Sequence, residues 1–156
     1  MEAVTRRALD FRDFGAVAAE VERLRRTGYD QAGNWNLAQV CDHLAAAMRG
    51  SVEGFPFPGP WFFRTLIGPF ARRVFFRRRR MPAGIQIPER FRPAADVDEA
   101  AAVRAFHAAL ALVRDWPGEF VPHPILGRFT PAQWRQFHLI HAAHHLSFLV
   151  PRDTTT

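Results

Sequence analysis

Three histidines in the C-terminal stretch QFHLIHAAHHLSFL have a spacing that suits metal binding. His138, His141 and His145 fall at positions i, i+3 and i+7, so a helix would carry all three on one face. Histidine is the commonest protein ligand for first-row metals, and imidazoles inside an apolar segment need polar partners that a hydrophobic core does not supply. His144 points about 100° away from His145, and we expect it to make a surface or interhelical hydrogen bond. The pattern predicts a metal site on this helix.

Such a site needs a third ligand from another element, because His141 and His145, at i and i+4, supply only two adjacent ligands. His43 is the candidate, since it lies among apolar residues on the expected inner face of a second helix. Cys41, the only cysteine, lies about 160° around that helix from His43. We therefore expect a divalent ion held by histidines, with no thiolate ligand.

The other candidate residues have structural alternatives. A single histidine on an apolar face is more often a hydrogen-bonded core residue than a ligand. His138 could support a ligand, contact the substrate or belong to the core, and Gln39, one turn before His43, could also support the site. His123 could likewise support the site, although we expect it to order its loop, HPILGRF, and we assign a structural role to His107.

The N-terminal part of the chain predicts two helices. Apolar residues recur at three- and four-residue steps over residues 10–27, a pattern typical of an amphipathic helix that ends at Gly28. Asn36 and Gln39 then form the pattern of a capping box. We expect the second helix to start there and to run to the Gly-Pro cluster at residues 54–60.

The middle of the chain is rich in arginine and proline. Gly68 and Pro69 interrupt the apolar pattern of residues 61–80, which predicts a kinked or broken helix. Residues 81–95 are expected to form a long, proline-rich surface loop.

Two further capping boxes are predicted in the C-terminal part. Asp96 and Glu99 are expected to open a helix that ends before Pro117, and Thr130 and Gln133 to open a last helix that runs to Pro151. Four or five helices with little strand signal favour an all-α bundle.

Composition limits the classes of protein to be considered. The 156 residues, 48% of them hydrophobic, suit one domain over residues 1–156. All 21 basic side chains are arginine, which excludes Schiff-base and Walker-type lysine chemistry. No apolar run approaches the roughly 18 residues of a membrane span, and the first residues mix charges of both signs. We expect no transmembrane segment and a cytoplasmic location.

Two segments resemble a known family. GNWNLAQVCDHLAAAM and HPILGRFTPAQWRQFHLIHAAHHLSFL are similar to the DinB superfamily of metal-binding four-helix bundles, in particular to an uncharacterised bacterial branch of it. The middle of the chain matches only in length and helical character. The resemblance implies an up-down-down-up four-helix bundle with a broken arginine-rich middle helix, in which His43, His141 and His145 hold zinc or nickel.

The same resemblance implies a thiol as cofactor. Characterised members of the superfamily include thiol-dependent S-transferases and a mycothiol-dependent isomerase, so we expect a low-molecular-weight thiol and a small-molecule substrate. An open three-histidine site suits that chemistry, because metal coordination lowers the pKa of a thiol.

Arg77–Arg80 form an unbroken basic run with aromatic neighbours. A solvated helix end is one interpretation. The run could instead bind anionic membrane or nucleic acid, or clamp the carboxylate of an acidic substrate. The leading expectation involves no nucleic acid. An aromatic cluster at residues 55–63 could cover the bundle mouth or form a homodimer contact.

Three hypotheses follow from the sequence. The first is a metal- and thiol-dependent transferase or isomerase. The second is a non-enzymatic binding module with structural histidines, in which Arg77–Arg80 contact nucleic acid or an anionic membrane. The third keeps the metal in a structural role only.

Overall fold

The computed structural model describes residues 5–57, 59–84, 87 and 89–152. Helix α1 (Phe14–Thr27) begins where the Asp13 side chain accepts a hydrogen bond from the Ala16 backbone N–H. The expectation of a start near residue 10 was wrong, because Asp13 is in an extended conformation. Gly28, at φ 70°, ends the helix as expected.

Two predicted capping boxes are confirmed. Asn36 and Gln39 exchange side-chain and backbone hydrogen bonds at the start of α2 (Leu37–Glu53). Thr130 and Gln133 do the same at the start of α5 (Pro131–Leu146), where Pro131 occupies a position with no hydrogen bond to lose. The helices that carry the candidate ligands therefore begin at residues fixed by local sequence.

The third predicted box is wrong in its position. Helix α4 (Glu99–Asp115) is capped by Asp98, whose side chain accepts from the Ala101 backbone N–H, and not by Asp96. Both aspartates lie just before the apolar pattern, and the structure uses the later one.

The arginine-rich segment is helical through Gly68 and Pro69. A π-helical segment, η1 (Phe63–Ile67), leads directly into α3 (Gly68–Arg78). The wider π turn and the position of Pro69 at the start of α3 remove the clash that a proline causes inside an α-helix. A Cβ at Gly68 would lie 2.7 Å from the Phe63 carbonyl oxygen, so the close approach there requires glycine. The irregularity expected at this point is a change of helix type.

The last element of the described residues is a strand, at a position where a helix was expected. Helix α5 stops at Leu146, and β2 (Leu149–Pro151) pairs antiparallel with β1 (Tyr29–Gln31). The predicted loop after α3 contains a short 3₁₀ turn, η2 (Glu89–Phe91), and residues 85, 86 and 88 of that prediction lie outside the described residues.

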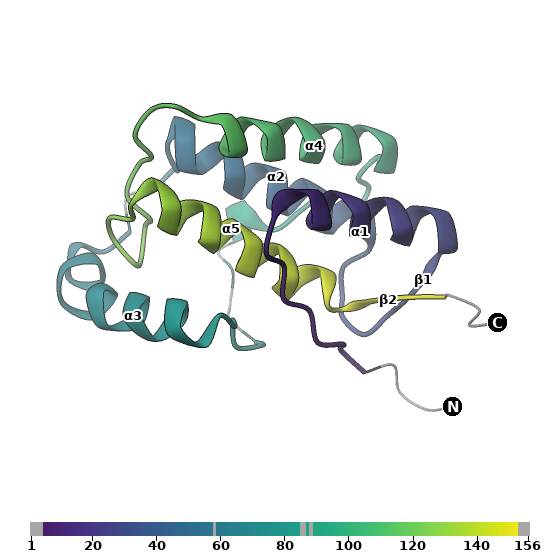
Figure 1. Cartoon of the computed structure of the whole chain (residues 1–156), viewed down its shortest axis with the longest axis horizontal. Helices are drawn as coiled ribbons and strands as arrows, with labels where there is room; N and C mark the ends of the chain where they lie inside the picture. The colour runs from purple at the N-terminus through teal and green to yellow at the C-terminus, as the bar shows by residue number, and fades with distance from the viewer. Residues whose placement is uncertain (1–4, 58, 85–86, 88, 153–156) are drawn as a thin grey trace.

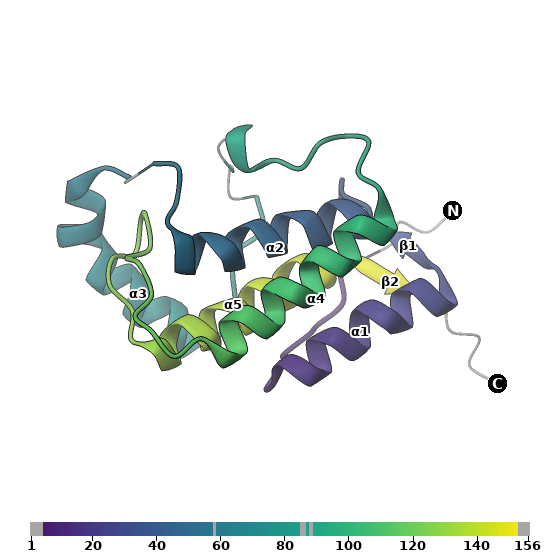
Figure 2. The same ribbon diagram turned by 90° about the horizontal axis from the view of Figure 1, so that it is seen from above.

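The fold is mainly helical, with this two-stranded sheet as the only sheet among the described residues. Helices α1, α2, α4 and α5 lie side by side, and α3 lies beside the N-terminal half of α5 (Figures 1 and 2). The core between the helices includes the fully buried Trp134, Phe106 and Leu44. None of the helices in the described ranges is both long and apolar enough to cross a bilayer.

Candidate metal centre

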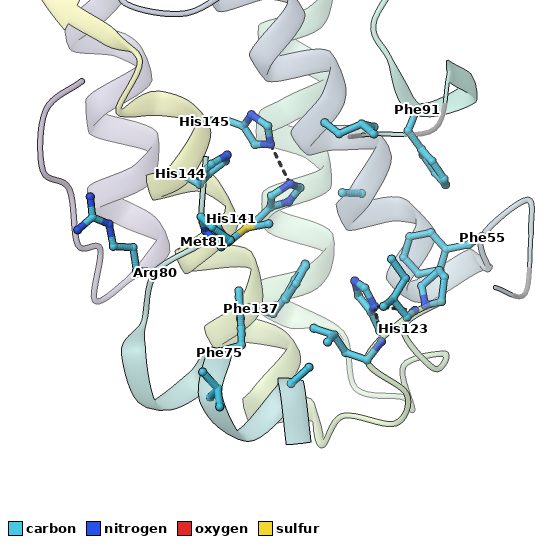
Figure 3. A pocket seen from close by; sticks show the side chains of 18 of the residues that line it. Phe55, Phe75, Arg80, Met81, Phe91, His123, Phe137, His141, His144 and His145 are labelled. Atoms are coloured by element: carbon cyan, nitrogen blue, oxygen red, sulfur yellow. Dashed lines mark hydrogen bonds between the residues drawn. The ribbon is translucent and has the colours of Figure 1, made fainter. Parts of the chain in front are cut away.

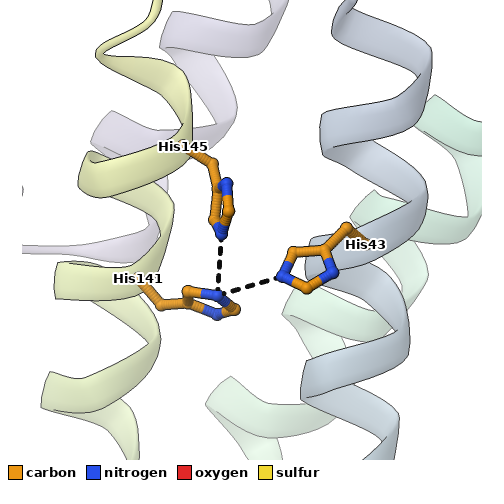
Figure 4. Close-up of side chains that lie close together, drawn as sticks. All are labelled: His43, His141 and His145. Atoms are coloured by element: carbon orange, nitrogen blue, oxygen red, sulfur yellow. Dashed lines mark hydrogen bonds between the residues drawn. The ribbon is translucent and has the colours of Figure 1, made fainter. Parts of the chain in front are cut away.

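His43 and the histidine pair of α5 meet at the contact between two helices. His43 projects from the second turn of α2, and His141 and His145 project toward it from successive turns of α5 (Figure 4). All three side chains are buried, each with 7% of its surface exposed. The structure thus brings together the three residues that the sequence put forward as ligands.

The three imidazoles converge through their Nε2 atoms. His141 Nε2 lies 3.2 Å from His43 Nε2 and 3.0 Å from His145 Nε2. One ligand atom from each residue lies within 4.8 Å of the others, and among the described residues this is the group with the geometry of a metal site. Two nitrogens bound tetrahedrally to zinc, at about 2.0–2.1 Å each, lie roughly 3.3 Å apart. The observed spacing is close to that separation.

The tautomer of His43 is fixed by the backbone. Its Nδ1 lies 3.0 Å from the carbonyl oxygen of Phe91. Because a carbonyl only accepts, Nδ1 carries the proton and Nε2 presents a lone pair to the cluster. An N–H held by a carbonyl is the usual support for a metal-binding histidine. His141 differs, since its Nδ1 is buried without a hydrogen-bond partner among the described residues.

Burial keeps the cluster neutral. Burial lowers the pKa of His43, and the hydrogen bond to Phe91 opposes only part of that effect. Burial also places the pKa values of His141 and His145 well below the ordinary value, and each is lowered further by neighbouring histidines. At neutral pH the three rings are therefore neutral, which is the protonation state that metal binding requires.

Aromatic rings hold the imidazoles in place. Trp35, just before α2, stacks on His145 with ring centroids 5.2 Å apart and an interplanar angle of 15°. The same indole lies 5.0 Å from the His43 ring, and Phe137 lies 5.5 Å from the His141 ring. These contacts limit rotation of the rings and keep the cluster partly dry.

The proposed supporting residues have other partners. Gln39 bonds to the Asn36 backbone in the capping box and donates to the Ala94 carbonyl. His138 lies 3.0 Å from Ser51 Oγ, inside the core. Nδ1 of His123 accepts from the Ile125 and Leu126 backbone N–H groups, so His123 orders its loop.

The remaining histidines and the cysteine lie outside the cluster. His144 contacts the Arg6 guanidinium at 3.2 Å, and its ring is 4.8 Å from that of His145. His107 pairs with Glu22 at 2.9 Å on the surface. Cys41 is fully buried, and burial raises the pKa of its thiol to about 12, so it remains protonated.

A cavity of about 1010 Å³ adjoins the three histidines. Aromatic and aliphatic residues of α3, the loop after it, the HPILGRF loop and α5 form much of its wall, including Phe75, Phe91 and Phe137 (Figure 3). Its size suits a small organic molecule. The cluster is therefore a buried three-histidine site that a ligand can approach from one side.

Several residues of the site were not found from the sequence. Phe91 acts through its backbone carbonyl, which leaves no sequence signal. His144 lines the cavity although its helical direction predicted a position away from the site. Arg78 and Arg80 line it too, and they belong to the run that the sequence offered as a possible clamp for an acidic substrate. Trp35 was part of a segment that carries the family resemblance but was not predicted to contact the histidines. Its position immediately before the capping box of the helix that bears His43 was a signal for such a contact.

The comparisons with known proteins give a family but no activity. The profile of a family described as a protein of unknown function (DUF1569) matches residues 3–152. No curated protein and no solved structure matches the chain significantly.

Proposed function

We propose that this chain, which belongs to the DUF1569 family, binds one divalent metal ion through the Nε2 atoms of His43, His141 and His145. The observation that carries the proposal is the convergence of three buried, neutral imidazoles on one point. Hydrogen bonds among the three rings satisfy their nitrogen lone pairs poorly. His141 Nε2 faces two other nitrogens, at 3.2 and 3.0 Å, and one N–H can point well at only one of them. A cation satisfies all three lone pairs together.

Zinc or nickel fits the donor set. Imidazole nitrogen suits both ions, and three protein ligands leave positions open for water or substrate. The three ligands are neutral, so they do not offset the double charge of the ion. An anionic exogenous ligand is therefore favoured at the open position.

We assign to this site a metal-dependent transfer or isomerisation that uses a low-molecular-weight thiol. The resemblance of the two histidine-bearing segments to the DinB superfamily supports the assignment, as does the side-by-side arrangement of α1, α2, α4 and α5, which is compatible with an up-down-down-up bundle. A bound ion would lower the pKa of a coordinated thiol. The protein's own residues orient the ligands: the Phe91 carbonyl fixes the His43 ring, and Trp35 and Phe137 shield the imidazoles from water.

Metal content is the direct test. Untagged protein should bind close to one equivalent of zinc or nickel, measured by elemental analysis after dialysis. His43→Ala and His145→Ala should each weaken binding more than about 100-fold, because losing a ligand costs more than losing a group that supports one. His107→Ala, at an exposed histidine, is the matched control and should bind normally. Full occupancy in His43→Ala would contradict the proposed ligand set.

A thiol assay separates a catalytic from a structural metal. Loaded protein should accelerate attack of a low-molecular-weight thiol on 1-chloro-2,4-dinitrobenzene, with release of chloride, and chelation should abolish the acceleration. Tight metal binding that raises the melting temperature without accelerating any thiol of a panel would assign the ion a structural role.

One observation favours a second candidate function, binding to an anionic membrane. Trp61, Leu66 and Phe70 have 66%, 70% and 73% of their surface exposed, and the exposed Arg77 and Arg78 follow on the same helical segment. Exposed apolar side chains beside cations are typical of surfaces that bind lipid. Flotation with phosphatidylglycerol vesicles tests this candidate, and salt-sensitive binding that Trp61→Ser and Phe70→Ser together abolish would support it.

A further inference from the structure

The wall of the cavity beside the three histidines has an unusual composition. Apart from five histidines and two arginines, the described residues that line it are apolar, and no Asp or Glu is among them. Phe55, Phe75, Phe91 and Phe137 supply much of the surface (Figure 3). A sugar would find few hydrogen-bonding partners on this wall. The lining instead suits an aliphatic or aromatic body.

The two arginines give the cavity a charge preference. Arg78 and Arg80 line it at the C-terminal end of α3, and Arg80 lies at the edge of the cavity near Met81 and His144 (Figure 3). Both are exposed, and neither forms an ion pair with a carboxylate among the residues that the structure describes. An unopposed pair of guanidinium groups attracts an anion.

Nearby arginines of the same segment have protein partners. Arg72 donates to the Arg128 carbonyl, and Arg79 bonds to Asp10 and to the Phe11 carbonyl. The arginines of this segment thus differ in their contacts: Arg72 and Arg79 join it to other parts of the chain, whereas Arg78 and Arg80 line the cavity.

We infer that the cavity binds an amphipathic acid, with its aliphatic or aromatic body against the phenylalanine-rich wall and its anionic group at Arg78 and Arg80. The inference that this acid is the substrate rests on the proposed function. As a binding property it does not require the metal, because neither the phenylalanine-rich part of the wall nor the two arginines belong to the three-histidine cluster. The acidic group at the rim leaves the opposite, metal-facing part of such a molecule free to react.

Binding of saturated fatty acids tests the inference. Isothermal titration with octanoate, decanoate and dodecanoate should be performed on protein with zinc and on protein treated with chelator, below the micellar concentration of each probe. Each buried methylene adds about 0.8 kcal/mol, or roughly 4-fold in affinity, so decanoate should bind about 15-fold more tightly than octanoate. Dodecyltrimethylammonium, with the same tail and the opposite charge, should bind much more weakly than dodecanoate.

Substitutions test which residues bind the anionic group of the ligand and which bind its apolar body. Arg78→Gln with Arg80→Gln should weaken dodecanoate binding about tenfold, since exposed charge pairs contribute modestly. Arg73→Gln with Arg77→Gln makes the same charge change at exposed positions of the same helix that do not line the cavity, and should leave affinity unchanged. Val74→Trp, which fills part of the cavity, should weaken all three acids. The melting temperature of each variant reports whether it folds.

The outcomes separate this inference from the proposed metal site. Chain-length-dependent binding that requires Arg78 and Arg80 in chelator-treated protein supports the inference, even if no metal is ever found. Absent dodecanoate binding, equal binding of the cationic probe, or equal losses in the two double variants overturns it, even if the metal binds in full. Binding that needs zinc and ignores Arg78 and Arg80 also overturns it, because the acid would then lie on the ion.

Discussion

The protein should lose stability in mild acid because His138 is buried in its neutral form. Its side chain has 1% of its surface exposed, and burial lowers its pKa to about 3. Ser51 donates its hydroxyl proton to the Met48 carbonyl, so His138 Nε2–H donates to Ser51 Oγ, 3.0 Å away. His138 Nδ1 has no partner within the described part of the chain, and nothing there compensates a positive charge.

The sign and size of the effect follow from proton binding. In the unfolded chain the pKa of a histidine is about 6.5. Between that value and about 3 the unfolded state binds a proton that the native state does not, so the free energy of unfolding falls as the pH falls. The contribution of His138 is complete above pH 6.5 and declines by about 1.4 kcal/mol per pH unit below it. From pH 7 to pH 5 the loss is about 2 kcal/mol.

A double substitution isolates this contribution. His138→Phe keeps a ring against Trp134, whose centroid is 5.3 Å from that of His138, and Ser51→Ala removes the hydroxyl that would lose its donor. Urea unfolding followed by tryptophan fluorescence at pH 7, 6 and 5, with chelator present, gives the free energy of unfolding of both proteins. All other histidines are common to both and cancel in the difference. His107→Asn, an exposed site, is the control.

The expected result is a smaller pH dependence in the variant. Between pH 7 and pH 5, the double variant should lose about 2 kcal/mol less free energy of unfolding than the parent protein does. The loss in His107→Asn should differ from that of the parent protein by less than half this amount. Equal pH dependence in the parent protein and the double variant would refute the reasoning, because it would mean that His138 accepts a proton in the native state as readily as in the unfolded chain.

Three further outcomes are expected. Gly59→Ala should lower the melting temperature strongly, since φ is +66° and a Cβ would lie 1.9 Å from the Pro124 carbonyl oxygen. Gly84→Ala, at φ +80° in open space, is the control and should cost only about 1 kcal/mol of stability. Equal losses of stability in the two variants would disprove the clash at Gly59. Glu20→Gln should reduce the free energy of urea unfolding by about 3 kcal/mol, because the buried Glu20 carboxylate pairs with Arg7, and an unchanged value would show that the pair contributes nothing. Chelating the metal should lower the melting temperature, corresponding to about 4 kcal/mol at a metal concentration 1,000 times Kd, and adding zinc should restore it; an unchanged melting temperature would count against a bound ion.

Local sequence was sufficient to predict helix starts where the capping side chain and the backbone group that it bonds lie close together in the chain. Thr130 with Gln133, and Asn36 with Gln39, place the starts of the two ligand-bearing helices correctly because the box bonds lie within four residues. The box rule favoured Asp96, because Glu99 lies three residues after it, whereas Ala101 follows Asp98 at that spacing and cannot complete a box. The structure nevertheless uses Asp98, whose side chain alone accepts from the Ala101 backbone N–H. The same rule therefore gave two correct helix starts and one displaced start.

Long-range contacts decided the parts that sequence did not predict. The segment after Leu146 was expected to remain helical, but Leu149–Pro151 pairs with Tyr29–Gln31. Strands of three residues have too little periodicity to be recognised. The tertiary contact therefore outweighed the local helical pattern.

The candidate site also contains residues that local sequence predicts and residues that depend on long-range packing. The α5 pair and the inward direction of His43 follow from helical spacing, so the three histidines could be selected from the sequence. The Phe91 carbonyl that holds His43, and the cavity wall, come from loops whose paths depend on packing. The residues that would bind the ion were therefore easier to predict than those that would select its ligand.

The distance along the chain between the two halves of the cluster has a consequence for protein synthesis. His43 and His141 are 98 residues apart in sequence, so α2 leaves the ribosome long before its partner helix is made. Until α5 is complete, the nascent chain offers only one of the three imidazoles, which is too few to retain an ion. If the cluster binds a metal ion as proposed, the ion can therefore be held only after α5 has been made and has packed against α2.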